Sequence, residues 1–123
     1  MDKAKDIYFS IVIPARNEAA NVRQCIESVL ANNPDIGFEV VFADSSTDRT
    51  ADIVKSLGVR VLEQVPGTIS AVRNTGARAV TRGSVLVFMD GDMQVPSDWL
   101  DLAKAWFDGG FKGALGFTES APA

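Results

Sequence analysis

Two aspartates separated by one glycine, Asp90-Gly91-Asp92, are the residues whose types and spacing point most directly to chemistry. A spacing of two keeps both carboxylates on the same side of an extended chain, and Gly91 adds no bulk and permits an unusual turn. Hard carboxylate oxygens suit Mg²⁺ or Mn²⁺, which proteins hold through one or two carboxylates together with substrate phosphates. The pair therefore predicts a divalent-metal site, and an Asp-Gly hairpin turn is the plainer alternative.

Polar residues also follow the first two predicted strands. Residues 14–18 (Pro-Ala-Arg-Asn-Glu) offer backbone amides and polar side chains to a base edge or a phosphate. Asp44 follows the second strand, where a carboxylate accepts hydrogen bonds from a nucleobase N–H or a ribose hydroxyl. Both groups have a structural interpretation as well, because Asn17 is a good helix cap and residues 44–48 have the composition of a turn that starts a helix.

Arg73 and Asn74 lie on a predicted helix. An arginine there binds a phosphate through two parallel hydrogen bonds, or it simply lies on a solvated helix face. Trp99 and Trp106 are predicted to be core residues at helical spacing, and Cys25 to be a small buried hydrophobe.

Alternating strands and helices must position these residues. Val85–Met89 is the most continuous apolar run and predicts a central strand buried on both faces. The alternation implies an α/β fold with a mainly parallel sheet, in which ligands bind at the carboxyl ends of the strands. Strands are predicted at 9–14, 38–43, 59–62, 85–89 and 112–117, and helices at 17–30, 48–57, 69–80 and 97–108, with Asn17 and Ser97 as caps of the first and last helix.

Length and composition limit the function classes. The 123 residues correspond to one domain, with 16 acidic against 12 basic residues, no histidine and one cysteine. Histidine-based zinc sites, Ser-His-Asp triads and internal disulfides are excluded. The basic residues are scattered, so binding to nucleic acid is disfavoured. No apolar run is long enough to span a bilayer, and the single cysteine favours a cytoplasmic setting.

Neither a glycine-rich dinucleotide fingerprint nor a P-loop occurs. A receiver-type signalling domain with a Mg²⁺ pocket has a similar length and a similar alternation of strands and helices. It requires an acidic pair after the first strand, however, and this chain has Pro-Ala-Arg-Asn there, at residues 14–17. A sugar-nucleotide pyrophosphorylase would need a glycine-rich, basic loop at the same place.

Together, four segments resemble the nucleotide-sugar-binding half of family 2 glycosyltransferases with a GT-A fold. They are P-A-R-N-E at 14–18, A-D-S-S-T-D at 43–48, R-N-T-G at 73–76 and D-G-D at 90–92, within a resemblance that runs from about Tyr8 to Phe107. It implies a Rossmann-like three-layer α/β/α domain over residues 1–123 and an inverting hexosyltransferase that uses a nucleotide-diphosphate sugar, with UDP as the expected nucleotide.

The resemblance also implies roles for individual residues. Asp90 and Asp92 would bind Mg²⁺ or Mn²⁺, and the metal would hold the diphosphate. The family usually has V-D-D-G-S-T-D where this chain has residues 43–48, which leaves open whether Asp44 or a neighbour reads the base. The residues implied in binding the nucleotide sugar are Pro14, Ala15, Asn17, Glu18, Asp44, Arg73, Asn74, Asp90 and Gly91.

Members of the family continue with an acceptor-binding half that carries the catalytic base. The sequence stops soon after the fourth predicted helix, so we expect a truncated donor half, in which Glu119 comes too early to be that base. A donor-binding module without turnover is therefore an alternative. The expected acceptor is a saccharide or a lipid, the expected location is the cytoplasm or the cytoplasmic face of a membrane, and a homodimer through residues 111–117 is predicted.

Overall fold

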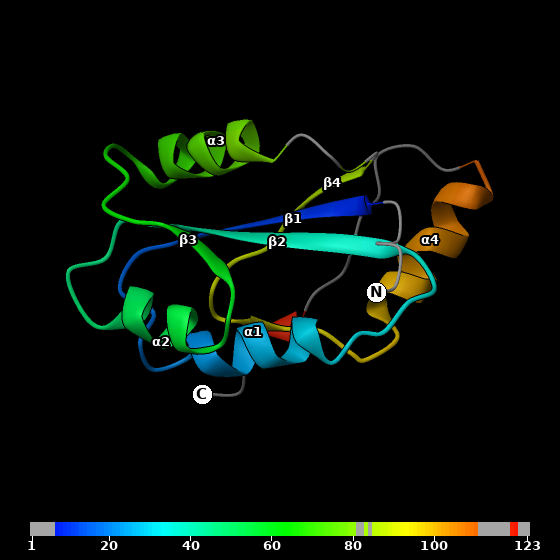
Figure 1. The fold of residues 1–123 in the computed structure, drawn as a ribbon, viewed down its shortest axis with the longest axis horizontal. Coiled ribbons are helices and arrows are strands. Elements are labelled where there is room, and N and C mark those ends of the chain that lie inside the picture. Colours follow the sequence, from blue (N-terminus) through cyan, green and yellow to red (C-terminus); the bar gives the residue numbers. More distant parts are fainter. Residues whose placement is uncertain (1–6, 81–82, 84, 111–118, 121–123) are drawn as a thin grey trace, which may run out of the picture.

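A parallel sheet of four strands lies between helices on both of its faces (Figure 1). The computed structural model describes residues 7–80, 83, 85–110 and 119–120. Helices α1 and α2 cover one face of the sheet and α3 covers the other, which confirms the α/β class. The elements are β1 (Ile7–Ala15), α1 (Val22–Leu30), β2 (Gly37–Asp44), α2 (Thr50–Ser56), β3 (Arg60–Leu62), α3 (Ile69–Ala79), β4 (Val85–Phe88), β5 (Met93–Gln94), α4 (Trp99–Asp108) and β6 (Glu119–Ser120).

The sheet has the strand order β3-β2-β1-β4, and all of its pairings are parallel. In register, Ala15 pairs with Asp44 of β2, and Val12 pairs with Phe88 of β4. The chain therefore runs outward from β1 to β3 on one side and returns through α3 to the other side of β1. Such a reversal marks the edge of the sheet where α/β proteins bind ligands.

Alternation along β1 divides the core between the two faces of the sheet. Phe9, Ile11 and Ile13 are fully buried beneath α1 and α2, whereas Val12 is buried on the opposite side, where α3 packs. Gly76 brings α3 close to the sheet, because a Cβ at this position would lie 2.6 Å from Val12 Cγ1 and 3.2 Å from Ala43 Cβ. The close contact of α3 with β1 and β2 depends on the missing side chain.

The prediction that Val85–Met89 is a central strand buried on both faces is wrong. β4 is an edge strand of the described sheet and ends at Phe88, and Leu86 and Phe88 are 47% and 43% exposed. Only Val85 and Val87 pack against the main core. A continuous apolar run does not distinguish a strand covered on both faces from one whose second face is open.

Two predicted helix caps are also wrong. Asn17 has a φ of 57° and lies in a loop, and α1 begins only at Val22 with Asn21 at the N-cap position. Ser97 does not cap α4, whose N-cap position is Asp98 without a side-chain cap. The amide of Leu100, in the first turn of α4, donates instead to Asn32 Oδ1 at 2.9 Å. The cap thus comes from the residue that follows the C-cap of α1.

The segment after β4 turns sharply and does not form the alternative hairpin. β5 pairs antiparallel with β6 and not with β4, with Gln94 opposite Glu119. Trp106 is 45% exposed, which corrects its assignment to the core, while Trp99 packs against the core. The predicted strand at 112–117 lies outside the described residues. Among the helices of the described part, none is long and apolar enough to cross a membrane.

Candidate functional site

The carboxyl ends of β2, β1 and β4 bring three loops together. The Ser45 amide, just after β2, donates to the Ala15 carbonyl at the end of β1 at 3.0 Å. On the other side of β1, a Cβ on Gly91 would lie 3.1 Å from Ala15 Cβ and 3.3 Å from Glu18 Cγ. Ala15 therefore lies between the loop that follows Asp44 and the Asp90–Asp92 turn.

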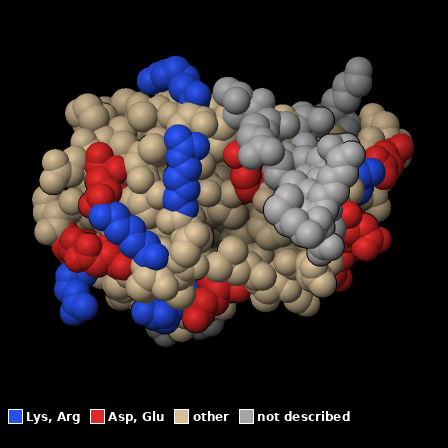
Figure 2. All heavy atoms as spheres, in the orientation of Figure 1, with Lys and Arg blue, Asp and Glu red and all other residues tan. Residues whose placement is uncertain are grey.

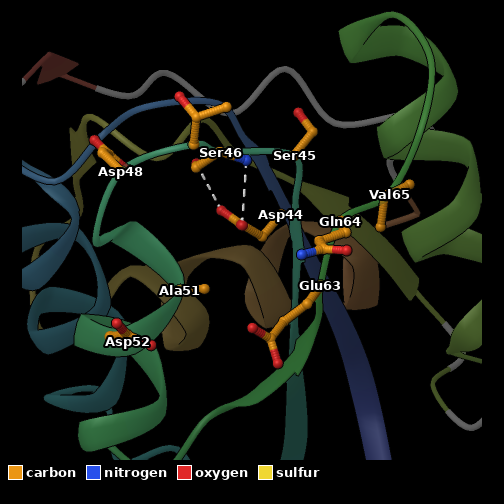
Figure 3. Close-up of a pocket in the computed structure, with 10 residues that line it drawn as sticks. Asp44, Ser45, Ser46, Asp48, Ala51, Asp52, Glu63, Gln64 and Val65 are labelled. Carbon is orange, nitrogen blue, oxygen red and sulfur yellow. Dashed lines mark hydrogen bonds between the residues drawn. The ribbon is translucent and has the colours of Figure 1, made fainter.

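A pocket of about 500 Å³ opens beside Asp44, between the loop after β2, helix α2 and the segment after β3 (Figure 3). Its lining contains four carboxylates and no basic side chain, so its electrostatic potential disfavours an anion and favours N–H and O–H donors. The lining residues are Asp44, Ser45, Ser46, Thr47, Asp48, Ala51, Asp52, Glu63, Gln64 and Val65.

Asp44 is only 3% exposed, and its carboxylate is held by the loop that follows it. Oδ1 accepts from the Ser46 hydroxyl at 2.7 Å and Oδ2 accepts from the Ser46 amide at 3.2 Å (Figure 3). An ionised carboxylate has about four lone-pair positions, so both oxygens keep the capacity to accept from a bound molecule. The carboxylate is therefore fixed in place and still able to accept a hydrogen bond from an N–H or O–H group of a bound molecule.

The loop after β1 is hydrogen-bonded to the loop after β2 at successive positions. The Asn17 amide donates to Ser46 Oγ at 2.8 Å, and Asn17 Oδ1 accepts from the Thr47 amide at 2.9 Å. The Glu18 amide donates to Thr50 Oγ1 at 3.0 Å. The Asn17 side chain thus supports the wall of the pocket.

Asp48 lies one residue before the N-cap position of α2, which is Arg49, so the helix begins two residues later than predicted, although the side chain of Asp48 binds its first residue. Its Oδ1 accepts from the Thr50 amide at 3.0 Å and from the Thr50 hydroxyl. These two hydrogen bonds, the hydroxyl first, lower the pKa of Asp48 below its ordinary value.

The Asp90–Asp92 turn is closed by a hydrogen bond from the Met93 amide to the Asp90 carbonyl at 3.1 Å. Beneath it lies Cys25 of α1, whose Sγ is 3.6 Å from the same carbonyl. Burial raises the pKa of the Cys25 thiol to about 12, with further contributions from Asp92, Glu18 and Asp90 in that order. Cys25 is the buried hydrophobe that the sequence predicted.

These carboxylates fit a divalent cation that the substrate helps to hold. No group of three or more acidic or cysteine side chains within the described residues is arranged to enclose an ion. Mg²⁺ and Mn²⁺ often bind through one or two carboxylates and complete their shell with water and substrate phosphates. Asp90 and Asp92 carry hard carboxylate oxygens of this kind, so they are the residues of this turn that would hold a shared ion.

Arg73 and Asn74, the candidate residues on a predicted helix, lie apart from the pocket. Arg73 is on α3 with its guanidinium 5.7 Å from the centroid of the Phe88 ring at the end of β4, a cation–π distance. Asn74 is exposed on the same helix. Neither residue is among those that line the pocket at Asp44.

Sequence reasoning missed one wall of the pocket, formed by Glu63, Gln64 and Val65. These residues directly follow β3, so the rule that selected the ends of the other strands would also have selected them. Gln64 has a φ of 53°, and the Val65 amide donates to the Asp44 carbonyl at 2.8 Å. The wall therefore belongs to the same edge of the sheet.

On the face shown in Figure 2, basic and acidic side chains of the described residues are interspersed, without a continuous basic stripe. One exposed pair, Lys55 and Glu63, forms a salt bridge next to the pocket. A nucleic-acid backbone would need a positive stripe, which this face does not offer.

Comparison with known proteins places these features among glycosyltransferases. The model of the family "Glycosyl transferase family 2" matches residues 10–121. Glycosyltransferase AglE of Haloferax volcanii is 31% identical over 103 residues, which are 76% of this chain and 33% of AglE.

Solved structures share the fold. Staphylococcus aureus TarS 1–349 in complex with UDP-GlcNAc superposes with a TM-score of 0.72 at 26% identity, over 84% of this chain and 32% of that TarS fragment. Mannosyltransferase PcManGT from Pyrobaculum calidifontis, in complex with GDP-Man and Mn²⁺, gives a TM-score of 0.71 at 26% identity, over 86% and 36% of the two chains. The GT-A fold expected from the sequence is confirmed, and the chain spans about a third of the length of these relatives.

Proposed function

The chain belongs to glycosyl transferase family 2, and we propose from this premise that residues 1–123 form a domain that binds a nucleotide-diphosphate sugar with Mg²⁺ or Mn²⁺. The observation that carries the proposal is the meeting of the Asp44 loop, residues 14–18 and the Asp90–Asp92 turn around Ala15. The family match also sets aside the receiver-type alternative.

The nucleoside binds at the Asp44 end of the site. The pocket there is acidic, so a neutral base or ribose with N–H and O–H donors fits it better than a phosphate does. The fixed, buried carboxylate of Asp44 is the group best placed to accept from such a donor. UDP is the nucleotide that the sequence favours; the related structures contain UDP-GlcNAc in one case and GDP-Man in the other.

The diphosphate binds at the other end, next to the Asp90–Asp92 turn. Two anionic groups, the diphosphate and the carboxylates, repel each other unless a cation lies between them. Asp90 and Asp92 would hold this cation, which neutralises charge on the departing diphosphate. Pro14 and Ala15, which are buried, and Glu18 connect the two ends of the site. The missing side chain of Gly91 lets the Asp90–Asp92 turn approach them, because a Cβ there would lie 3.1 Å from Ala15 Cβ and 3.3 Å from Glu18 Cγ.

Arg73 and Asn74 have a proposed role at the sugar-diphosphate end. The contact of Arg73 with Phe88 places its guanidinium near the end of β4, two residues before Asp90. A planar guanidinium binds a phosphate through two hydrogen bonds. Arg73 is therefore suited to the diphosphate, and Asn74, the next residue of α3, is proposed to line the donor pocket beside it.

In the complete reaction, a base deprotonates an acceptor hydroxyl, whose oxygen then bonds to the anomeric carbon of the hexose with inversion. The bond from that carbon to the diphosphate breaks, and the nucleoside diphosphate leaves with the electron pair. We assign no residue of this chain as the base. A binding module without turnover is the alternative, and formation of a glycoside by the purified chain would exclude it.

Three further features stay predictions. The acceptor is expected to be a saccharide or a lipid, and the location is expected to be the cytoplasm or the cytoplasmic face of a membrane. Self-association is expected because β4 is an edge strand with Leu86 and Phe88 exposed. A mass near 13.2 kDa at every concentration in light scattering would exclude the dimer.

Calorimetry with UDP and GDP, with and without Mn²⁺, tests the proposal. We expect one nucleotide to bind in Mn²⁺ and to bind at least tenfold more weakly in chelator, because the cation removes the repulsion between like charges. Asp92→Asn should abolish most of this difference, whereas Asp101→Asn, on the exposed surface of α4, should preserve it. Equal affinity with and without metal would refute the role of Asp90 and Asp92.

A further inference from the structure

Arg16 joins the three loops that surround the nucleoside pocket, although it does not line the pocket itself. Arg16 follows β1, its Nε donates to Ser45 Oγ after β2 at 3.0 Å, and its Nη2 donates to the carbonyl of Gly67 after β3 at 2.6 Å. Ser45 is part of the pocket lining, and Gly67 comes two residues after Val65, the last lining residue of the opposite wall. One guanidinium therefore bridges two walls of the pocket.

Several contacts hold the wall after β3. Glu63 pairs with Lys55, and Val65 is buried and packs with Ala43 and Val72. The Val65 amide donates to the Asp44 carbonyl at 2.8 Å, at the base of the pocket. On either side of Val65, Gln64 and Gly67 adopt positive φ values of 53° and 102°. A non-glycine residue in the left-handed region carries a conformational cost that the surrounding contacts must offset. At the far end of this segment, the contacts that hold the chain are the bond from Arg16 to Gly67 and the cap of α3, in which Thr68 Oγ1 accepts from the Ala71 amide at 3.2 Å.

We propose that Arg16 is a positioning residue that sets the separation of the pocket walls and thereby selects between a pyrimidine and a purine nucleotide. The proposal rests on the function proposed above and adds a specificity determinant to it. A guanidinium presents its donors in a rigid fork, so it holds Ser45 and Gly67 at a fixed distance from each other. A lysine has the same charge but a single ammonium group, which cannot maintain this bridge.

The first test measures the wall without any ligand. Hydrogen exchange of the Val65 amide, which donates to the Asp44 carbonyl at 2.8 Å, should be about five- to tenfold faster in Arg16→Ala and Arg16→Lys, since one or two hydrogen bonds contribute about 1 kcal/mol or slightly more. Arg60→Ala is the matched control, because Arg60 is exposed and donates one bond to a backbone carbonyl, that of Ala79, at the amino end of β3. Unchanged exchange in the Arg16 variants would overturn the proposal.

The second test measures selectivity. Dissociation constants of UDP and GDP in Mn²⁺ give a ratio for each variant, and we expect this ratio to move toward one by about fivefold or more in Arg16→Ala and in Arg16→Lys. Arg60→Ala should keep the ratio of the unmodified chain. A purely structural role would lower both affinities equally and leave the ratio constant, and this result would refute the specificity role.

The lysine variant separates geometry from charge. If Arg16→Lys retains the original ratio, the residue acts through its charge, and the bridging argument is wrong. If the unmodified chain binds neither nucleotide, the proposed function fails while the exchange experiment still decides whether Arg16 holds the wall. The two failures are therefore distinguishable.

Discussion

Replacing Asn32 by alanine should destabilise the protein more than the loss of one polar side chain usually does. Asn32 is 4% exposed, and its side chain makes three hydrogen bonds. Its Oδ1 accepts from the Leu100 amide at 2.9 Å, and its Nδ2 donates to the carbonyls of Pro96 at 3.1 Å and Ser28 at 3.2 Å. The side chain thus attaches the end of α1 to the beginning of α4.

The size of the stability loss in Asn32→Ala depends on which hydrogen-bond partner of Asn32 stays buried in the variant. The Pro96 carbonyl keeps a second bond, from the Trp99 amide at 3.1 Å, whereas Leu100 is fully buried and its amide would lose the bond to Asn32. An unsatisfied buried donor costs about 1–3 kcal/mol, and the loss of a helix cap typically costs about 1 kcal/mol. Because these two estimates partly describe the same bond, we expect a loss of about 2–3 kcal/mol.

Urea denaturation would measure this loss, and thermal melting should show a decrease in Tm of about 10 °C. Asn33→Ala is the matched control, since Asn33 is the exposed neighbour of Asn32. NMR-detected exchange should accelerate at the Leu100 amide in Asn32→Ala. Ordinary surface substitutions change the free energy of unfolding by up to about 0.5 kcal/mol. If the free energies of unfolding of the two alanine variants agreed within this range, the cap from Asn32 would not contribute to stability.

Two predictions concern titratable groups. The Thr50 hydroxyl and amide lower the pKa of Asp48 from its ordinary value of 3.8. The stabilisation that this carboxylate provides is therefore present above pH 3.8, and it disappears as the pH falls through the lower pKa of the folded state. Asp48→Ala should therefore melt at a lower temperature than the unmodified chain at pH 7, and a gap that did not narrow below pH 3.8 would contradict this assignment. Burial, with a smaller effect of nearby carboxylates, raises the pKa of the Cys25 thiol to about 12. At pH 8, iodoacetamide should therefore modify the folded chain at least about a hundredfold more slowly than the chain in urea. Equal rates of modification would mean that the thiol is accessible in the folded chain.

Periodicity in the sequence predicted the types of the main elements because their apolar residues face one side. Val22, Ile26 and Val29 are all fully buried on α1, as a helical spacing requires. The same reasoning failed for β4, where Leu86 and Phe88 are exposed. Hydrophobicity reports what a residue prefers and not whether the fold provides a neighbour on that face.

The site was predictable where a local rule applied. The ends of β1, β2 and β4 meet, as expected for parallel strands, so the grouping of Ala15, Asp44 and Gly91 follows from the alternation of elements. The function of Asn32 was not predictable, because its partner Leu100 is 68 positions away. Asn17 was misread as a cap because no sequence pattern reveals its positive φ.

The place of β1 at the centre of the sheet also has a consequence for the path by which the chain folds. β1 pairs first along the sequence with β2, whereas Phe9 meets Val85 of β4 only after most of the chain has been made. Each doubling of the loop that a contact closes adds about 0.6 kcal/mol of entropic cost, so the β1–β2 pair is the easier one to nucleate. The pocket beside Asp44 can therefore form early, and the acidic turn that follows β4 is completed only when β4 docks on the other side of β1.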